Sequence, residues 1–253
     1  MFLVHAIKDK NRFVLATDLD GTFLGGSADE RDSLYKWLEQ HRDEFVLIFV
    51  SGRGQGFMRK LAHSLPIRPD VCIGDVGTSV HLGPELMPLP DLEDWIDSAW
   101  RPDASIILAS TLQTCAQLCP QQHCGGRRLS YTFKDLNSAY RAALMIRAHG
   151  FDVLISDQHF LDVLPRGVQK GSTLLRTLNH LELSLNKTFV AGDTLNDLSM
   201  FESGLTGVVV HNSESALKQA LVDRENVYFS AANGAAGVLE GLKRFYYAKG
   251  DDK

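Results

Sequence analysis

The sequence has no long apolar run. Its longest stretches of consecutive apolar residues have about six members, whereas a helix that crosses a bilayer needs about 20. The first residues reach a charge at Lys8, which leaves too short an apolar stretch for a secretory signal. We therefore expect a cytoplasmic protein.

Basic residues are not in excess either. The 253 residues include 26 Lys and Arg against 31 Asp and Glu, a formal net charge of −5. Without a broad cationic surface, nucleic acid is not an expected partner. Hydrophobic residues at 44% and charged residues at 23% are typical of a folded globular protein, and the length suits one large domain or two small ones.

Cysteine is scarce, with four in the chain. Three of them share one segment with a histidine, at Cys115, Cys119, His123 and Cys124, and this cluster has the residue types of a zinc site. The spacing matches none of the common structural zinc patterns. Cys115 and Cys119 are four residues apart, as neighbours on one helix face are, so ordinary reduced thiols are the expectation.

Short apolar runs are present instead, at 13–16, 45–50, 71–73, 189–191 and 208–210. Continuous apolar runs are typical of parallel strands buried on both faces. Segments with the apolar spacing of helices lie between them, at 28–40, 57–65 and 172–181. This alternation predicts an α/β fold with a doubly wound, Rossmann-like parallel sheet.

The middle of the chain has a different pattern. Proline and glycine cluster at 83–90, which predicts a domain boundary. Beyond it we expect helices at 92–100, 104–118 and 137–149, and strands at 128–133, 153–155 and 160–164. The sequence therefore predicts a smaller α/β domain, residues 84–166, inserted into a core of residues 1–83 and 167–253.

Polar segments follow three of the predicted strands directly: TDLDGT from Thr17, SGR from Ser51 and GDTLND from Gly192. In open α/β sheets, ligands bind beyond the carboxyl ends of the strands, so these segments are expected to converge. Their carboxylates would repel one another unless a cation joined them, and oxygen ligands favour Mg²⁺. The glycines allow the close backbone approach that phosphate oxygens require.

Asp18 and Asp20 are two residues apart, so in extended backbone their side chains point to the same side. They are then placed to attack and to protonate one substrate. The other interpretation is that one of them caps a turn or a helix. Together with SGR and GDTLND at strand ends, the pair favours phosphate chemistry.

These segments, with Lys170 and the glycine after it, resemble the four motifs of the haloacid dehalogenase superfamily of phosphatases, in the same order. The resemblance implies that Asp18 is the nucleophile that becomes an aspartyl phosphate. It implies that Asp20 is the general acid and then the general base. Phosphoryl transfer depends mainly on charge stabilisation, which a metal ion and a lysine beside the nucleophile supply.

The same resemblance assigns a phosphate site and a metal site. The phosphate-binding residues that it implies are Thr22, Ser51 and the Gly52 amide, with Lys170 steadying the nucleophile and the phosphate. The Mg²⁺ ligands that it implies are Asp18, the backbone carbonyl of Asp20 and Asp193, with Asn196 and Asp197 contacting the metal or its waters.

The predicted insertion lies between SGR and Lys170, a position that resembles the α/β cap of the sucrose-phosphate phosphatase-like branch. IGDVGTSVHLG, FLDVLPRGVQKGSTL and NVYFSAANGAAGVLEGLKRF are each similar to a segment of that branch, so the resemblance covers nearly the whole chain. One departure is Asp75, where a small neutral residue such as serine is expected. An added carboxylate there is expected to alter substrate preference, which argues against sucrose 6-phosphate itself.

The sequence thus predicts a Mg²⁺-dependent phosphoric monoester hydrolase that acts on a small sugar phosphate, such as a disaccharide or glycoside phosphate, as a monomer or small homo-oligomer. The candidate substrate contacts are Asp75, Tyr131, Lys134, Gln158 and His159. One alternative is a phosphomutase or phosphotransferase of the phosphomannomutase kind. The other is a non-catalytic sugar-phosphate sensor, against which the intact nucleophile argues.

Overall fold

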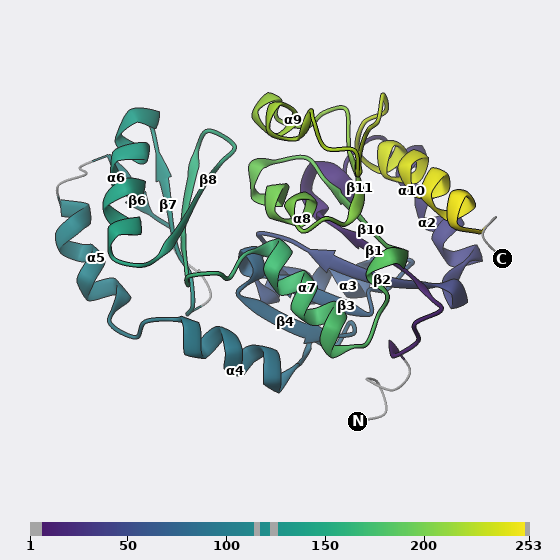
Figure 1. Cartoon of the computed structure of the whole chain (residues 1–253), viewed down its shortest axis with the longest axis horizontal. Coiled ribbons are helices and arrows are strands. Elements are labelled where there is room, and N and C mark those ends of the chain that lie inside the picture. The colour runs from purple at the N-terminus through teal and green to yellow at the C-terminus, as the bar shows by residue number, and fades with distance from the viewer. Residues whose placement is uncertain (1–6, 114–116, 122–125, 251–253) are drawn as a thin grey trace.

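The computed structural model describes residues 7–113, 117–121 and 126–250 of the chain. Two sheets carry the fold, and the chain passes from the larger to the smaller and back (Figure 1). The larger sheet has the strand order β12-β11-β10-β1-β2-β3-β4-β5, and the smaller has the order β6-β7-β9-β8. No helix in the described ranges has the length and apolar character needed to cross a membrane.

The larger sheet is parallel except at one edge. Its parallel strands are β12 (Val227–Phe229), β11 (Thr206–Val209), β10 (Thr188–Gly192), β1 (Phe13–Thr17), β2 (Phe45–Val50) and β3 (Val71–Gly74). β4 (Ser79–Leu82) and β5 (Met87–Pro88) extend it as antiparallel strands. The predicted α/β fold with a doubly wound parallel core is confirmed, and the antiparallel edge adds to it.

Helices cover both faces of the larger sheet. Side chains alternate between the faces along each strand, and the strands are apolar at successive positions, so both faces carry apolar side chains that must be buried. In β1, Val14 and Ala16 join one hydrophobic cluster, whereas Phe13 and Leu15 join the other. The first cluster is covered by α4 (Pro90–Ala99), α7 (Lys170–His180), α8 (Leu198–Glu202) and α9 (Ser215–Leu221). The second is covered by α2 (Ala28–Gln40), α3 (Gln55–Ser64) and α10 (Gly234–Gly250).

The smaller sheet is antiparallel, and helices pack on one of its faces. Its strands are β6 (Leu118–Pro120), β7 (Leu129–Phe133), β9 (Phe160–Leu164) and β8 (Asp152–Ser156), and its helices are α5 (Ala104–Gln113) and α6 (Leu136–Ala148). α6 ends two residues before Gly150, whose φ of +87° suits the residue after a helix end. The helix expected at 104–118 is shorter than predicted, because Leu118–Pro120 pair with β7.

The proline- and glycine-rich segment at 83–90, predicted as a domain boundary, contains the turn of the β4–β5 hairpin. Gly83 and Leu86 both have positive φ at the turn that joins β4 to β5. Leu92 and Ile96 of α4 then pack in the same cluster as β1. Residues 87–99 therefore lie with the larger sheet, although the prediction placed them in the smaller domain. The rest of the predicted division stays a prediction.

Two of the four cysteines lie among the described residues, and neither forms a disulfide there. Cys72 is buried in β3, and burial raises the pKa of its thiol to about 12. Cys119 is free and exposed in β6. Cys115, His123 and Cys124, the other members of the cluster considered for zinc, lie outside the described residues.

Candidate active site

The carboxyl ends of β1, β2 and β10 meet at one edge of the larger sheet, since these strands are parallel neighbours. Thr17, the last residue of β1, pairs with Phe49 of β2 and with Ala191 of β10. The residues after these ends line a cavity of about 550 Å³. The predicted site residues that line the cavity are Asp18, Asp20, Ser51, Gly52, Asp193 and Asn196. The smaller sheet contributes Ser130, Phe160 and Asp162 to the lining.

Lys170 is a buried cation at this site. Its side chain is fully buried at the start of α7. Its Nζ donates to Asp18 Oδ1 at 2.7 Å, to Asn196 Oδ1 at 2.6 Å and to Asp197 Oδ1 at 2.7 Å. Burial alone would lower the pKa of Lys170, but the carboxylates of Asp18 and Asp197 raise it above its usual value. The ammonium therefore stays charged and holds the nucleophile candidate in place.

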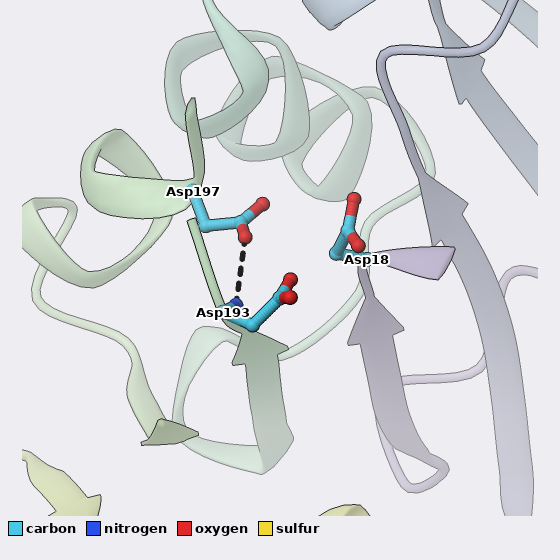
Figure 2. A group of neighbouring side chains, drawn as sticks. All are labelled: Asp18, Asp193 and Asp197. Atoms are coloured by element: carbon cyan, nitrogen blue, oxygen red, sulfur yellow. Dashed lines mark hydrogen bonds between the residues drawn. The ribbon is translucent and has the colours of Figure 1, made fainter. Parts of the chain in front are cut away.

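Three carboxylates converge beside this lysine. One oxygen from each of Asp18, Asp193 and Asp197 lies within 4.8 Å of the others, and Figure 2 shows the three side chains at the ends of β1 and β10. Asp197 also accepts hydrogen bonds from the backbone N–H groups of Asp193 and Thr194, at 2.9 and 3.1 Å. Oxygen donors carrying this much charge fit a hard divalent cation, so the triad is a candidate metal site.

Burial alters the protonation of this triad. It raises the pKa of Asp18 well above the usual value, an effect that Lys170 opposes and the other two carboxylates increase. Burial, followed by the charge of Asp197, raises the pKa of Asp193 to about 7. Nucleophilic attack and metal ligation both need the ionised carboxylates. A cation bound at the triad would favour those ionised forms.

The stability of the metal-free chain should depend on the ionisation of Asp193. Because its pKa of about 7 in the fold lies above the usual 3.8, its contribution to stability is complete below 3.8 and is lost as the pH rises through 7. Between pH 4 and 8 in EDTA, we expect wild type to lose about 2–4 kcal/mol more unfolding free energy than Asp193→Asn. Urea denaturation measures this difference, and a difference that does not change with pH would contradict the assignment.

Thr22 is placed differently from the prediction. Its hydroxyl is fully buried and donates to Asp193 Oδ1 at 2.9 Å, and it is not among the residues that line the cavity. Thr22 therefore orients a candidate metal ligand in this structure, although it was predicted to bind phosphate. The turn before it depends on Gly21, which has a φ of +81°, and a Cβ at that position would lie 2.2 Å from Asp193 Oδ2.

Arg53, the arginine of SGR, holds the predicted acid–base residue. Its Nε donates to Asp20 Oδ2 at 2.7 Å and its Nη2 donates to Oδ1 at 3.0 Å. Its guanidinium also lies 4.8 Å from the centre of the Phe57 ring. This guanidinium occupies both oxygens of Asp20, so the carboxyl group must leave Arg53 before it can contact a substrate. The sequence analysis did not assign this partner.

The smaller sheet presents the face opposite to the predicted one. Tyr131 of β7 is 9% exposed and packs in the hydrophobic cluster beneath α5 and α6, whereas its neighbour Ser130 lines the cavity. Lys134 and His159 are exposed, and neither belongs to the cavity lining. The apolar alternation at 129, 131 and 133 marked the core face of this strand. The polar residues between those positions were the available signal for the cavity face.

Arg128 joins the two sheets, and the sequence analysis missed it. Its Nη1 donates to the Gly52 carbonyl at 3.1 Å. The guanidinium also lies 3.4 Å from Asp75 Oδ1 and 3.6 Å from Asp162 Oδ1. Asp75, predicted as a substrate contact, is 4% exposed and is not among the cavity-lining residues. Its carboxylate instead pairs with an arginine that does line the cavity.

Comparison with known proteins identifies the family. The family model described as sucrose-6F-phosphate phosphohydrolase matches residues 11–246. The mannosylfructose-phosphate phosphatase of Agrobacterium fabrum is 31% identical over 92% of this chain and 96% of that protein. The glucosylglycerol-phosphate synthase of Pseudomonas anguilliseptica is 39% identical over 92% of this chain, which spans only 30% of that protein.

Solved structures share the fold. The sucrose-phosphatase of Synechocystis sp. PCC6803, solved with sucrose and phosphate, has a TM-score of 0.85 at 24% identity, over 93% of this chain and 98% of that one. A haloacid dehalogenase-like hydrolase from Bacteroides thetaiotaomicron has a TM-score of 0.66 at 17% identity, over 92% and 99% of the two chains. The predicted resemblance and, at the level of the family, the predicted phosphatase class are confirmed. The chain belongs to the sucrose-6F-phosphate phosphohydrolase family.

Proposed function

We propose that this chain is a Mg²⁺-dependent phosphatase that hydrolyses the phosphate monoester of a neutral glycoside through an aspartyl phosphate. The observation that carries the proposal is the buried contact between Asp18 and Lys170 at the edge of the cavity. A carboxylate held by a charged ammonium, with two further carboxylates beside it, is an arrangement suited to phosphate chemistry.

In the first step, a carboxylate oxygen of Asp18 attacks phosphorus and the bond to the sugar oxygen breaks. Asp20, once released from Arg53, gives a proton to the departing sugar oxygen. In the second step Asp20 takes a proton from water, and the water oxygen attacks phosphorus and releases Asp18. Ser51 and the Gly52 amide, which follow β2 and line the cavity, would bind the phosphoryl oxygens. Lys170 offsets the negative charge throughout.

The carboxylates of Asp18, Asp193 and Asp197 would hold the metal. The predicted roles of Asn196 and the Asp20 carbonyl toward it remain part of the proposal. A bound Mg²⁺ supplies positive charge that offsets the repulsion between the carboxylates and the phosphate. Thr22 and the backbone N–H groups of residues 193 and 194 keep the ligands oriented.

The cavity and the names of the relatives support a substrate class. A volume of about 550 Å³ lies within the usual range for small-molecule sites. The relatives are named for phosphates of sucrose, mannosylfructose and glucosylglycerol, each of which joins a sugar to a second polyol. We propose a glycoside phosphate of this kind as the substrate. We further propose that the smaller domain, from about residue 100 to 166, supplies the specificity.

Release of inorganic phosphate from a panel of substrates tests this function. The panel contains the phosphates of sucrose, mannosylfructose and glucosylglycerol, with glucose 6-phosphate and p-nitrophenyl phosphate for comparison. We expect one glycoside phosphate to exceed the others by at least about tenfold in kcat/KM, and EDTA to stop the reaction until Mg²⁺ is restored. Transfer of phosphate within the sugar, without release, would instead indicate a mutase. A rate of phosphate release that EDTA does not change would contradict the proposed need for a metal ion.

A further inference from the structure

A buried charge cluster that shares no residue with the candidate metal triad forms part of the cavity wall. It consists of Asp75, Arg128 and Asp162, whose exposed fractions are 4%, 9% and 5%. Asp75 comes from the turn after β3, whereas Arg128 and Asp162 come from the smaller sheet. Arg128 and Asp162 line the cavity, and Asp75 stands behind them. No step proposed above uses these three side chains.

One oxygen of this cluster has unused hydrogen-bonding capacity. Asp162 Oδ1 is buried and accepts no hydrogen bond within the described chain, although it lies 3.6 Å from Arg128 Nη1. That nitrogen donates to the Gly52 carbonyl at 3.1 Å instead. Leaving a buried charged acceptor unsatisfied is costly, so such groups normally have a donor. The cavity is the side from which a donor can arrive.

The charge of the cluster restricts what that donor can be. Two carboxylates and one guanidinium leave an excess of one negative charge when all three are ionised. Burial raises the pKa of Asp162, while Arg128 and the Ser130 hydroxyl lower it. A substrate hydroxyl can donate to Asp162 Oδ1. An ionised substrate carboxylate has no proton to donate, and both it and a second phosphate are repelled there by their negative charge.

We propose that Asp162 is a specificity-determining residue, which accepts a hydrogen bond from a hydroxyl of the substrate's polyol part and, with Asp75, excludes substrates that carry a second negative charge. The inference rests on the proposed phosphatase function and adds the chemistry of substrate choice to it. Asp75 acts indirectly, because its carboxylate lies beside the same Arg128 guanidinium as the carboxylate of Asp162. This gives a role to the carboxylate that stands where the branch is expected to have a small neutral residue.

Two inhibitors that differ in a single group test the inference. Glucitol 6-phosphate and 6-phosphogluconate have the same six-carbon chain, and only C1 differs, as a CH₂OH in one and a carboxylate in the other. Their inhibition constants are measured against p-nitrophenyl phosphate hydrolysis with Mg²⁺. For wild type we expect glucitol 6-phosphate to bind at least about tenfold more tightly. In Asp162→Asn we expect the two inhibition constants to differ by less than about threefold, mainly because glucitol 6-phosphate binds less tightly than it does to wild type.

Two more variants complete the design. Asp103→Asn removes a carboxylate that is exposed on the smaller domain and paired with Arg101, and it should keep the wild-type ratio. Asp75→Ser leaves Arg128 beside Asp162, so it should improve binding of 6-phosphogluconate and leave glucitol 6-phosphate within about twofold. If Asp162→Asn does not fold, as judged by circular dichroism, the inhibition constant of 6-phosphogluconate for Asp75→Ser tests the inference instead.

The outcomes separate this inference from the proposed function. An active wild type that binds both inhibitors equally, or variants that keep the full wild-type ratio, would overturn the inference alone. A wild type that hydrolyses no p-nitrophenyl phosphate with Mg²⁺ would overturn the proposed function, and the inference with it.

Discussion

Asp18→Asn should lower kcat by about four to six orders of magnitude, the size of loss seen when a catalytic nucleophile is removed. The amide has the shape of the carboxylate but lacks the charge that attacks phosphorus. It also cannot form the aspartyl phosphate, so brief exposure of the variant to radiolabelled substrate should leave no label on the protein. Rapid acid quenching of wild type should trap that label.

The fold should survive this substitution. Removing one of three crowded carboxylates reduces repulsion, so the midpoint of thermal unfolding in EDTA should not fall below that of wild type. Asp32→Asn, an exposed carboxylate on α2, is the matched control and should retain wild-type kcat. An Asp18→Asn enzyme with turnover within about tenfold of wild type would show that another group attacks the phosphate.

Lys170→Met should affect both stability and turnover strongly. Methionine fills a similar volume but leaves the carboxylates of Asp18 and Asp197 without their buried cation. We expect the free energy of unfolding in EDTA to fall by about 3–5 kcal/mol, the usual cost of removing one partner of a buried ion pair. With Mg²⁺, kcat should fall by about two to three orders of magnitude, since a charged donor to the nucleophile is lost.

Metal binding distinguishes this loss of charge from a simple loss of packing. A cation at the triad would replace part of the missing charge, so Mg²⁺ should raise the unfolding midpoint of Lys170→Met by more than it raises that of wild type. Lys36→Met removes an exposed lysine from α2 and should change neither property. A Lys170→Met chain that is as stable as wild type in EDTA would refute the buried ion pairs as a source of stability.

The parallel core could be predicted because its strands are buried on both faces. β1 and β2 are buried at every position, and apolar runs of this length, too short to cross a bilayer, are typical of parallel strands covered by helices. β4 and β5 lacked such a signal, since they are short strands at an edge and their turn contains the prolines and glycines usual at domain boundaries. The same residue types serve hairpins and linkers, so composition alone does not separate the two.

The residue types of the candidate site were predictable, but several of their partners were not. Asp18, Asp193 and Asp197 meet because strand ends meet, which follows from topology. Arg128 reaches Gly52 and Asp75 across 76 and 53 positions of sequence, and no local pattern encodes such a contact. Tyr131 was placed on the wrong face because an aromatic residue suits both a hydrophobic core and a sugar. The alternation of apolar and polar residues along β7 was the better indication of which face Tyr131 occupies.

The bridge that Arg128 makes between the two sheets bears on the rate of the cycle. Under the proposed function, the sugar phosphate binds in a cavity lined by a guanidinium that donates to the Gly52 carbonyl and lies beside two buried carboxylates. Any separation of the two sheets would break that hydrogen bond and expose those charges, so it would cost free energy. If the proposed product leaves by such a separation, its release rather than cleavage of the ester is expected to limit turnover at saturating substrate.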